Sequence, residues 1–154
     1  MICIEHATPA DAAAILDLQY RAYQSEAERY HDWQLPPLTQ TYAQLLADIE
    51  QQICLKATRA GRLAGSVRAY LAGDTGYIGR LIVEPAQQRQ GVGTCLMEAI
   101  ERALPQATRF ELFTGNQSEH SLALYHKLGY RVVRSAYVHP LLTLVYLQKL
   151  ARPL

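Results

Sequence analysis

The order of hydrophobic and polar positions along this chain of 154 residues predicts a mixture of helices and strands. Apolar residues such as Ile15, Leu18 and Ala22 recur at helical spacing, whereas other apolar runs are short and bounded by turn residues, as strands are. The pattern predicts strands at 2–7, 54–59, 63–71, 77–83, 109–114, 130–137 and 141–149, and helices from 9 to 22, from 39 or 41 to 51, from 91 to 104 and from 118 to 128.

Capping residues support several of these boundaries. Thr8 and Asp11 have the spacing of a capping box at the start of the first helix, and Thr41 and Gln44 form a second such pair. Gly129 follows the last helix and fits a left-handed C-cap. These local signals fix helix ends independently of the hydrophobic pattern.

The segment between the first two helices is less regular. Residues 23–33 lose the helical register, and Pro36-Pro37 predicts extended backbone that ends any helix there. The whole order, β-α-α-β-β-β-α-β-α-β-β, is that of a mixed α/β layer architecture. With no internal repeat and no linker, we expect one domain over residues 1–154.

Composition narrows the class of protein. The chain is 49% hydrophobic and 19% charged, which is too apolar for a disordered segment. Its 15 basic against 14 acidic residues argue against a dominant nucleic-acid-binding face. The widely spaced Cys3, Cys54 and Cys95 indicate a reducing compartment, and no apolar run reaches the length of a membrane span. Without a visible signal peptide, we expect a cytoplasmic protein with no membrane and no nucleic-acid partner.

The segment 77–94 carries the most specific chemical signal. It is a predicted strand, a polar loop and a helix start with two close glycines, Gly91 and Gly93. Unpaired N–H groups at a helix N-terminus attract an anion, and glycine lets a phosphate approach the backbone. A P-loop is excluded because no Gly-Lys pair follows, and a dinucleotide fingerprint because Leu96 stands where its third glycine belongs. Taken alone, this pattern is more often a plain glycine-capped helix start.

Two motifs together resemble the GNAT superfamily of N-acetyltransferases. The run Gln88-Arg89-Gln90-Gly91-Val92-Gly93 matches that family's Gln/Arg-x-x-Gly-x-Gly/Ala signature and follows a strand. Further along, Glu111-Leu112-Phe113-Thr114-Gly115 and Leu124-Tyr125-His126-Lys127-Leu128-Gly129-Tyr130 resemble the family's later strand and helix ending. The resemblance covers nearly the whole chain in order and spacing.

The resemblance implies a fold and a cosubstrate. The fold is a single α/β domain with a mixed, mostly antiparallel sheet of six or seven strands, flanked by about four helices. A central parallel pair, 77–83 and 109–114, is splayed to admit acetyl-CoA. By analogy with the family, acetyl-CoA is held by Leu81, Ile82, Val83, Gln88, Arg89, Gln90, Gly91, Val92, Gly93, Thr94, Ser118, Tyr125 and Lys127.

The resemblance also implies a catalytic acid. Tyr125 aligns with the family tyrosine that protonates the departing CoA thiolate, a role that suits a phenol. Its simpler interpretation is an aromatic helix residue packed against the last strands. Ser118 stands where many relatives have an asparagine that contacts the cofactor, and it can still cap its helix.

The general base is not fixed by the motif. Many relatives place a glutamate where this chain has Tyr77, which leaves Glu26 and Glu28, or His31 and Asp32, as alternatives after the first helix. Either glutamate could bind a cationic amine or act through water, although Glu-Ala-Glu-Arg is usually a solvated helix face. The other histidines, His120, His126 and His139 among them, lack partners at ligand spacing, so we expect no metal site.

The function predicted in this way is direct acetyl transfer from acetyl-CoA to a primary amine of a small molecule or peptide in a ternary complex. Two alternatives stay open. One is a non-catalytic acyl-CoA-binding sensor of the same fold, which the missing strand glutamate favours. The other is a nucleotide-binding domain that binds its phosphates at the same glycine-containing helix start. The sequence leaves open whether the protein forms a homodimer, and it does not identify the amine acceptor.

Overall fold

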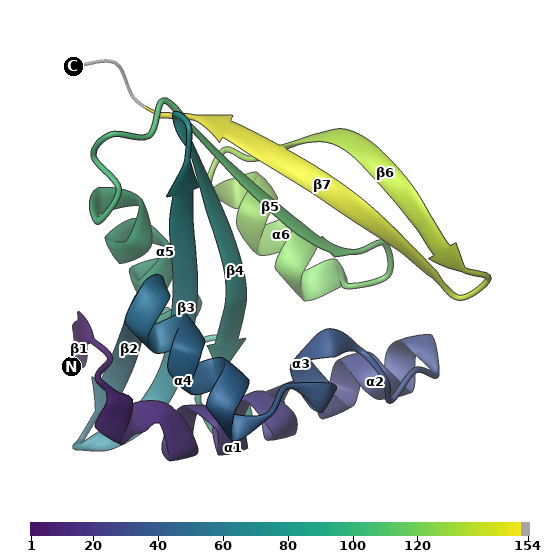
Figure 1. Cartoon of the computed structure of the whole chain (residues 1–154). Coiled ribbons are helices and arrows are strands. Elements are labelled where there is room, and N and C mark those ends of the chain that lie inside the picture. Colours follow the sequence, from purple (N-terminus) through teal and green to yellow (C-terminus); the bar gives the residue numbers. More distant parts are fainter. Residues whose placement is uncertain (152–154) are drawn as a thin grey trace.

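A computed structural model describes residues 1–151 of the chain. Seven strands of the described chain form one sheet in the order β1-β2-β3-β4-β5-β7-β6, and every neighbouring pair is antiparallel except β4 and β5 (Figure 1). The predicted mixed, mostly antiparallel sheet is therefore confirmed, with the higher strand number. The strands are β1 Ile2–His6, β2 Ile53–Arg59, β3 Arg62–Ala72, β4 Thr75–Val83, β5 Arg109–Gly115, β6 Arg131–His139 and β7 Leu142–Leu150.

Helices cover both faces of the sheet, so the domain has three layers (Figure 1). Helix α5 packs against β2, β3 and β4 on one face, and α1 and α4 pack on the opposite face. The helices are α1 Ala12–Ala22, α2 Gln24–Tyr30, α3 Pro36–Thr39, α4 Tyr42–Gln51, α5 Val92–Arg102 and α6 Glu119–Lys127, with short 3₁₀ turns η1 at Pro9–Asp11 and η2 at Pro85–Gln87.

Two of these helices differ from the sequence prediction. Residues 24–30 form α2 despite their weak register, because only Ala27 and Tyr30 turn inward on so short a helix. The expectation that Pro36-Pro37 ends any helix is wrong, since both prolines open α3. Proline is tolerated in a first helical turn, where the missing N–H would have no partner. Thr41 caps α4 as predicted, and Gly129 adopts φ +99° after α6.

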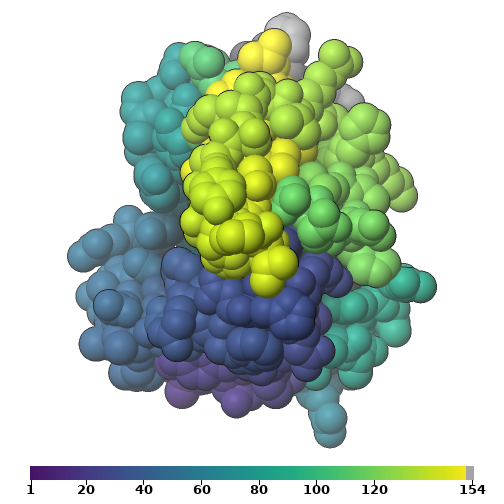
Figure 2. Space-filling view, turned by 90° about the vertical axis from the view of Figure 1, so that its right-hand side faces the viewer, coloured from purple at the N-terminus to yellow at the C-terminus, as the bar shows by residue number. Residues whose placement is uncertain are grey.

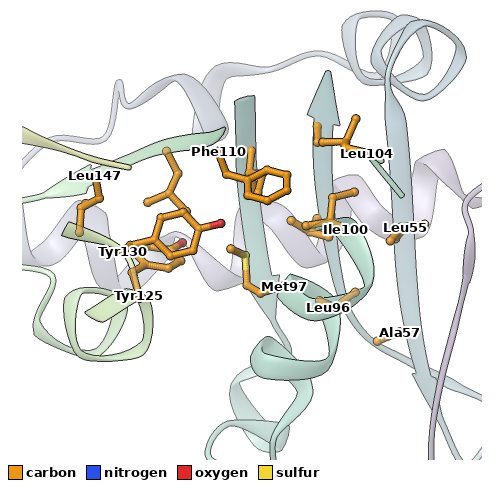
Figure 3. Packing of buried hydrophobic residues seen from close by; sticks show 14 of the residues in the cluster. Leu55, Ala57, Leu96, Met97, Ile100, Leu104, Phe110, Tyr125, Tyr130 and Leu147 are labelled. Atoms are coloured by element: carbon orange, nitrogen blue, oxygen red, sulfur yellow. The ribbon is translucent and has the colours of Figure 1, made fainter. Parts of the chain in front are cut away.

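The larger hydrophobic core lies between the sheet and helices α5 and α6 (Figure 3). Leu96, Met97 and Ile100 of α5 are fully buried there, and the rings of Tyr125 and Tyr130 lie 6.0 Å apart at its edge. A smaller cluster on the other face holds Ile15, Leu18, Leu45 and their neighbours from α1 and α4. Burying each such aliphatic side chain stabilises the fold by about 1.5–3 kcal/mol. The sheet thus stands rigidly between two packed layers.

The parallel strands β4 and β5 pair over only three residues. Their register runs from Thr75 opposite Arg109 to Tyr77 opposite Glu111, and no further pair follows within the described chain. Beyond Tyr77 the two strands diverge, so the β5-facing edge of β4 is left without a strand partner. The predicted splay of the central pair is confirmed.

A bulge in β4 lies at the point where the strands separate. Arg68 of β3 is opposite Gly79, whereas Ser66 is opposite Ile82, so β4 holds one extra residue here. Arg80 takes φ +52° within the bulge, in the left-handed region that side chains rarely adopt. As a result Ile78 packs in the α5-side core, but Ile82 packs on the α1 side, although both positions are even-numbered.

No helix among the described residues is long and apolar enough to cross a membrane.

Candidate active site

Two pockets open beside the split between β4 and β5. The larger pocket, about 590 Å³, lies among α2, α3, β4, β5 and the end of the β6–β7 hairpin. The smaller pocket, about 450 Å³, lies among β4, the start of α5, α6 and the α1–α2 junction. Tyr23 and Glu26 line both pockets. The two cavities therefore meet at the beginning of α2.

The start of α5 gives the smaller pocket an anion-binding wall. Gly91 is the N-cap residue at φ +85°, and a Cβ built on it would meet nothing within 4 Å. No side chain caps this helix, and its first turn carries no acidic residue. The N–H groups of Val92, Gly93 and Thr94 have no partner within the helix, since the first intrahelical bond runs from Cys95 to Gly91. These amides and the helix dipole suit a phosphate.

The open edge of β4 supplies the second wall of the smaller pocket. Leu81, Ile82 and Val83 line it. Because β5 has already diverged, backbone N–H and C=O groups on this edge can pair with an extended ligand as with an added strand.

The structure brings most of the predicted cofactor-binding residues together. Gln90 and Lys127 are exceptions, because both are exposed and line neither pocket. Gln90 accepts a hydrogen bond from Arg59 instead. The residues found in the wall of the smaller pocket are Leu81, Ile82, Val83, Gln88, Arg89, Gly91, Val92, Gly93, Thr94, Ser118 and Tyr125.

Two basic side chains stand at the rim of the smaller pocket. Arg89 lies in the polar loop before α5, and its Nη2 is 3.5 Å from Nε2 of His120 on α6. Both residues are exposed and line the pocket. The histidine was not among the residues predicted for the cofactor, because in sequence it is an ordinary residue of the first turn of a helix.

Tyr125 is both a core residue and a pocket residue. Its ring belongs to the α5-side core, and its side chain also lines the smaller pocket. Burial raises the pKa of its phenol above the ordinary value, and Tyr23 and Glu26 nearby raise it further. The hydroxyl therefore stays protonated at neutral pH, as a proton donor must.

Glu26 is held at the junction of the pockets by a hydrogen-bond chain. The Gln117 N–H donates to the Tyr30 hydroxyl at 2.8 Å, and the Ser118 hydroxyl donates to the Glu26 carboxylate at 2.9 Å. The Tyr30 and Ser118 hydroxyls are 2.7 Å apart, so Tyr30 is the donor between them. Arg29 adds an ion pair to Glu26 at 3.1 Å.

The hydrogen bonds among Tyr30, Ser118 and Glu26 explain two features of the β5–α6 segment. Ser118 makes no side-chain capping bond to α6, contrary to the sequence prediction; its hydroxyl donates to Glu26 and accepts from Tyr30. Gly115 is required next to it, because a Cβ there would lie 2.1 Å from the Tyr30 hydroxyl. The other predicted glutamate, Glu28, is exposed and lines neither pocket, so the structure does not bring it to the site. His31 is likewise exposed and outside both pockets.

The floor of the larger pocket is a polar network that the sequence analysis missed. Gln40 accepts hydrogen bonds at its Oε1 from Gln19, Arg68 and Arg80 at 3.0, 3.2 and 2.9 Å. Its Nε2 donates to Asp48 at 2.7 Å. The one available signal was Arg68 in the middle of an otherwise apolar strand, which predicts a buried polar partner.

The far side of the larger pocket is closed by the β6–β7 hairpin. Nε2 of His139, at the end of β6, lies 3.1 Å from a carboxylate oxygen of Asp32. Figure 2 shows the tip of this hairpin resting on the α2–α3 region. On the same side, Arg134 binds Glu111 through two hydrogen bonds of 3.2 and 2.9 Å, and these hold the pKa of Glu111 below its ordinary value. Glu111 is thus a structural anion, already neutralised.

No group of three or more potential metal-ligating side chains is found among residues 1–151. The three cysteines line neither pocket.

Comparison with known proteins identifies the family. The model of the acetyltransferase (GNAT) family matches residues 12–130. This chain therefore belongs to the GNAT acetyltransferase family. No curated protein matches the sequence significantly.

Solved structures share the fold at low identity. The ribosomal-protein-S18-alanine N-acetyltransferase from Escherichia coli superimposes with a TM-score of 0.79 at 18% identity, over 96% of this chain and 92% of that chain. The yncA protein of Salmonella typhimurium, solved with its cofactor acetyl-CoA, gives 0.77 at 21% identity, over 97% and 93%. The PaiA N-acetyltransferase of Thermoplasma acidophilum, in complex with coenzyme A, gives 0.78 at 15% identity, over 95% and 98%.

Proposed function

We propose that this protein transfers an acetyl group from acetyl-CoA directly to a primary amine, with both substrates bound at once. The observation that carries the proposal is the meeting of two pockets at Tyr23 and Glu26. One pocket has the walls that an acyl-CoA needs, and the other is a separate cavity large enough for an acceptor. A ternary complex follows from this layout, and no cysteine in either pocket offers a covalent route.

The smaller pocket fits acetyl-CoA on chemical grounds. The free N–H groups of Val92, Gly93 and Thr94 match a pyrophosphate, and Arg89 and His120 stand at the rim. The pantetheine arm carries two amides, which match the unpaired edge of β4 from Leu81 to Val83. Two structural relatives hold acetyl-CoA or coenzyme A, which supports the same occupant here.

The arm bound along β4 would bring the thioester to the bulge. A backbone N–H near Leu81 would then donate to the thioester carbonyl and stabilise the oxyanion of the tetrahedral intermediate. The amine nitrogen forms a bond to the carbonyl carbon, and the carbon–sulfur bond breaks. Acetyl-CoA supplies the acetyl group, and the products are an amide and coenzyme A.

Tyr125 and Glu26 would handle the protons of this step. Tyr125 carries a phenolic proton and lines the cofactor pocket, so it can donate this proton to the departing thiolate. Glu26 lines both pockets, and its carboxylate can orient the amine and take up the amine proton directly or through water. Ser118 and Arg29 fix this carboxylate in place.

Thiol release from acetyl-CoA, measured against a panel of primary amines, tests the proposal. We expect release that depends on the amine, together with calorimetric binding of coenzyme A stronger than that of ATP or NAD. Binding of coenzyme A without release for any amine would support an acyl-CoA sensor instead, a function that Tyr77 in place of a strand glutamate favours. Tighter binding of ATP or NAD would indicate a nucleotide-binding domain.

A further inference from the structure

Arg80 is a cationic side chain of the larger pocket with most of its donors unused. Its Nη1 donates one hydrogen bond, to Gln40, and no carboxylate of residues 1–151 lies within ion-pair distance of it. A guanidinium has five N–H donors arranged in a planar fork that suits a carboxylate. Arg80 is only half-buried, so a molecule in the larger pocket can reach it.

A second arginine makes this end of the pocket positively charged. Arg68 is 3% exposed and is held by Gln19, Gln40 and a single carboxylate, Asp48, at 3.5 Å. Arg68 and Arg80 donate to the same oxygen of Gln40. Burial lowers the pKa of Arg68, and repulsion from Arg80 lowers it further. Asp48 is thus the one carboxylate of residues 1–151 within ion-pair distance of either guanidinium group, and a bound anion would relieve their repulsion.

The backbone holds Arg80 in this position at a cost. Arg80 is the extra residue of the β4 bulge at φ +52°, and a left-handed conformation costs a side-chain-bearing residue about 1–2 kcal/mol. The bulge places Gly79 and Arg80 in succession at the larger pocket. Backbone strain of this kind is retained where a side chain must be aimed at a ligand.

The same cavity also holds a carboxylate, that of Glu26, which pairs with Arg29 at 3.1 Å. Glu26 stands at the junction with the smaller pocket, where the proposed acetyl transfer takes place. Tyr23 lines the cavity as well; burial raises the pKa of its phenol, and Arg80 and Glu26 act on that pKa in opposite directions. The pocket thus combines an anionic group at the proposed reaction centre with the cationic groups of Arg80 and Arg68.

We infer that the acceptor is a small amino acid-like molecule, whose amine lies at Glu26 and whose carboxylate is bound by Arg80. This inference rests on the proposed acetyltransferase function and names its substrate class. Free polyamines carry no carboxylate for Arg80, and a peptide holds its C-terminal carboxylate farther from its N-terminal amine than an amino acid does.

Matched pairs of acceptors test this assignment on the full-length protein. Each free α-amino acid is compared with its carboxamide, and spermidine and a tripeptide are added, with thiol release from acetyl-CoA as the readout. We expect at least one amino acid to be acetylated with a kcat/KM at least tenfold above that of its carboxamide. Spermidine and the tripeptide should be poorer than this amino acid.

Variants of Arg80 test whether its side chain causes the preference for the amino acid over its carboxamide. Arg80→Gln should raise the KM for that amino acid at least tenfold and leave the KM for its carboxamide unchanged, whereas Arg80→Lys should recover part of the loss. Arg62→Gln is the control, because Arg62 is exposed and lines neither pocket. Melting curves of all three variants show whether each is folded, and the comparison of two acceptors on one variant cancels any loss of active protein.

Equal turnover of acids and carboxamides, or a preference for spermidine or the tripeptide, would overturn the inference and leave the acetyltransferase proposal intact. An Arg80→Gln variant with an unchanged acid preference would also overturn it. Binding of coenzyme A without thiol release for any acceptor would overturn the proposed function, and the substrate class with it.

Discussion

Ser118 donates a hydrogen bond of 2.9 Å to the carboxylate of Glu26, although the two residues are 92 positions apart in the chain. The bond joins the start of α6 to α2 across the junction of the two pockets. The bond distinguishes Glu26 from Glu28, which the sequence alone does not tell apart. Glu26 is held at the junction of the two pockets, and Glu28 faces solvent.

Replacing Glu26 by Gln removes the carboxylate with little change of shape. We expect kcat/KM for the amine acceptor to fall by about 10²-fold or more, because a group that accepts the amine proton is lost. Affinity for coenzyme A should stay within about twofold. Steady-state kinetics and calorimetry measure the two quantities. Glu28→Gln is the matched control on the same helix and should leave both unchanged; equal losses in the two variants would refute the role of Glu26.

Replacing Tyr125 by Phe keeps the ring in the core and removes only the hydroxyl, which forms no hydrogen bond within residues 1–151. Turnover should fall at least tenfold, since the thiolate then leaves without a proton donor. Affinity for coenzyme A and the melting temperature should be nearly unchanged. If calorimetry shows that coenzyme A binding collapses together with kcat, Tyr125 is a structural residue.

Replacing Gly91 by Glu places bulk and negative charge at the anion-binding helix start. We expect coenzyme A affinity to fall by about 10²-fold or more, because the charge opposes a phosphate where the helix dipole favours one. Gly61→Glu controls for backbone strain, since Gly61 also has positive φ, at +77°, and open space around it. Both variants should lose similar stability, but only Gly91→Glu should lose affinity for coenzyme A. Unchanged calorimetric binding of coenzyme A by Gly91→Glu would exclude a phosphate site at the start of α5.

Two buried phenols predict a loss of stability at high pH. Burial raises the pKa of Tyr125 and of Tyr130, and Glu101 raises that of Tyr130 further. Above the unfolded-state pKa of about 10, the unfolded chain releases these protons while the folded chain retains them. Their contribution to the free energy of unfolding is therefore complete below pH 10 and falls as the pH rises, by up to about 1.4 kcal/mol per pH unit for each phenol.

Urea unfolding between pH 9 and pH 11 measures this dependence. The Tyr125→Phe variant should show a shallower decline than the original protein, and a further Tyr130→Phe change should flatten it again. Identical slopes in all three proteins would contradict the assignment of the raised pKa values.

The sequence by itself predicted the elements that local chemistry controls. The capping pair Thr41 and Gln44 and the helix start at Gly91 depend on residues within a few positions of one another. The parallel pair and its splay were implied by the resemblance of the motifs to the GNAT family, and the structure has both. At the capped helix ends the backbone geometry leaves few alternatives, so the pattern of residue types is sufficient.

Tertiary structure decided which side chains meet. Residues 26 and 28 are turned about 200° apart on a helix, and only the contacts of α2 with Gly115 and Ser118 show which one faces the pockets. Because of the bulge at Arg80, alternate residues of β4 that face one side of the sheet before the bulge face the other side after it. Strict alternation along a strand does not predict this change. The Gln40 network joins residues from four elements. The sequence thus predicted the family, because the motifs that identify it lie on contiguous segments of the chain. The charges of the larger pocket were decided only by folding, because they come from distant segments that the sheet brings together.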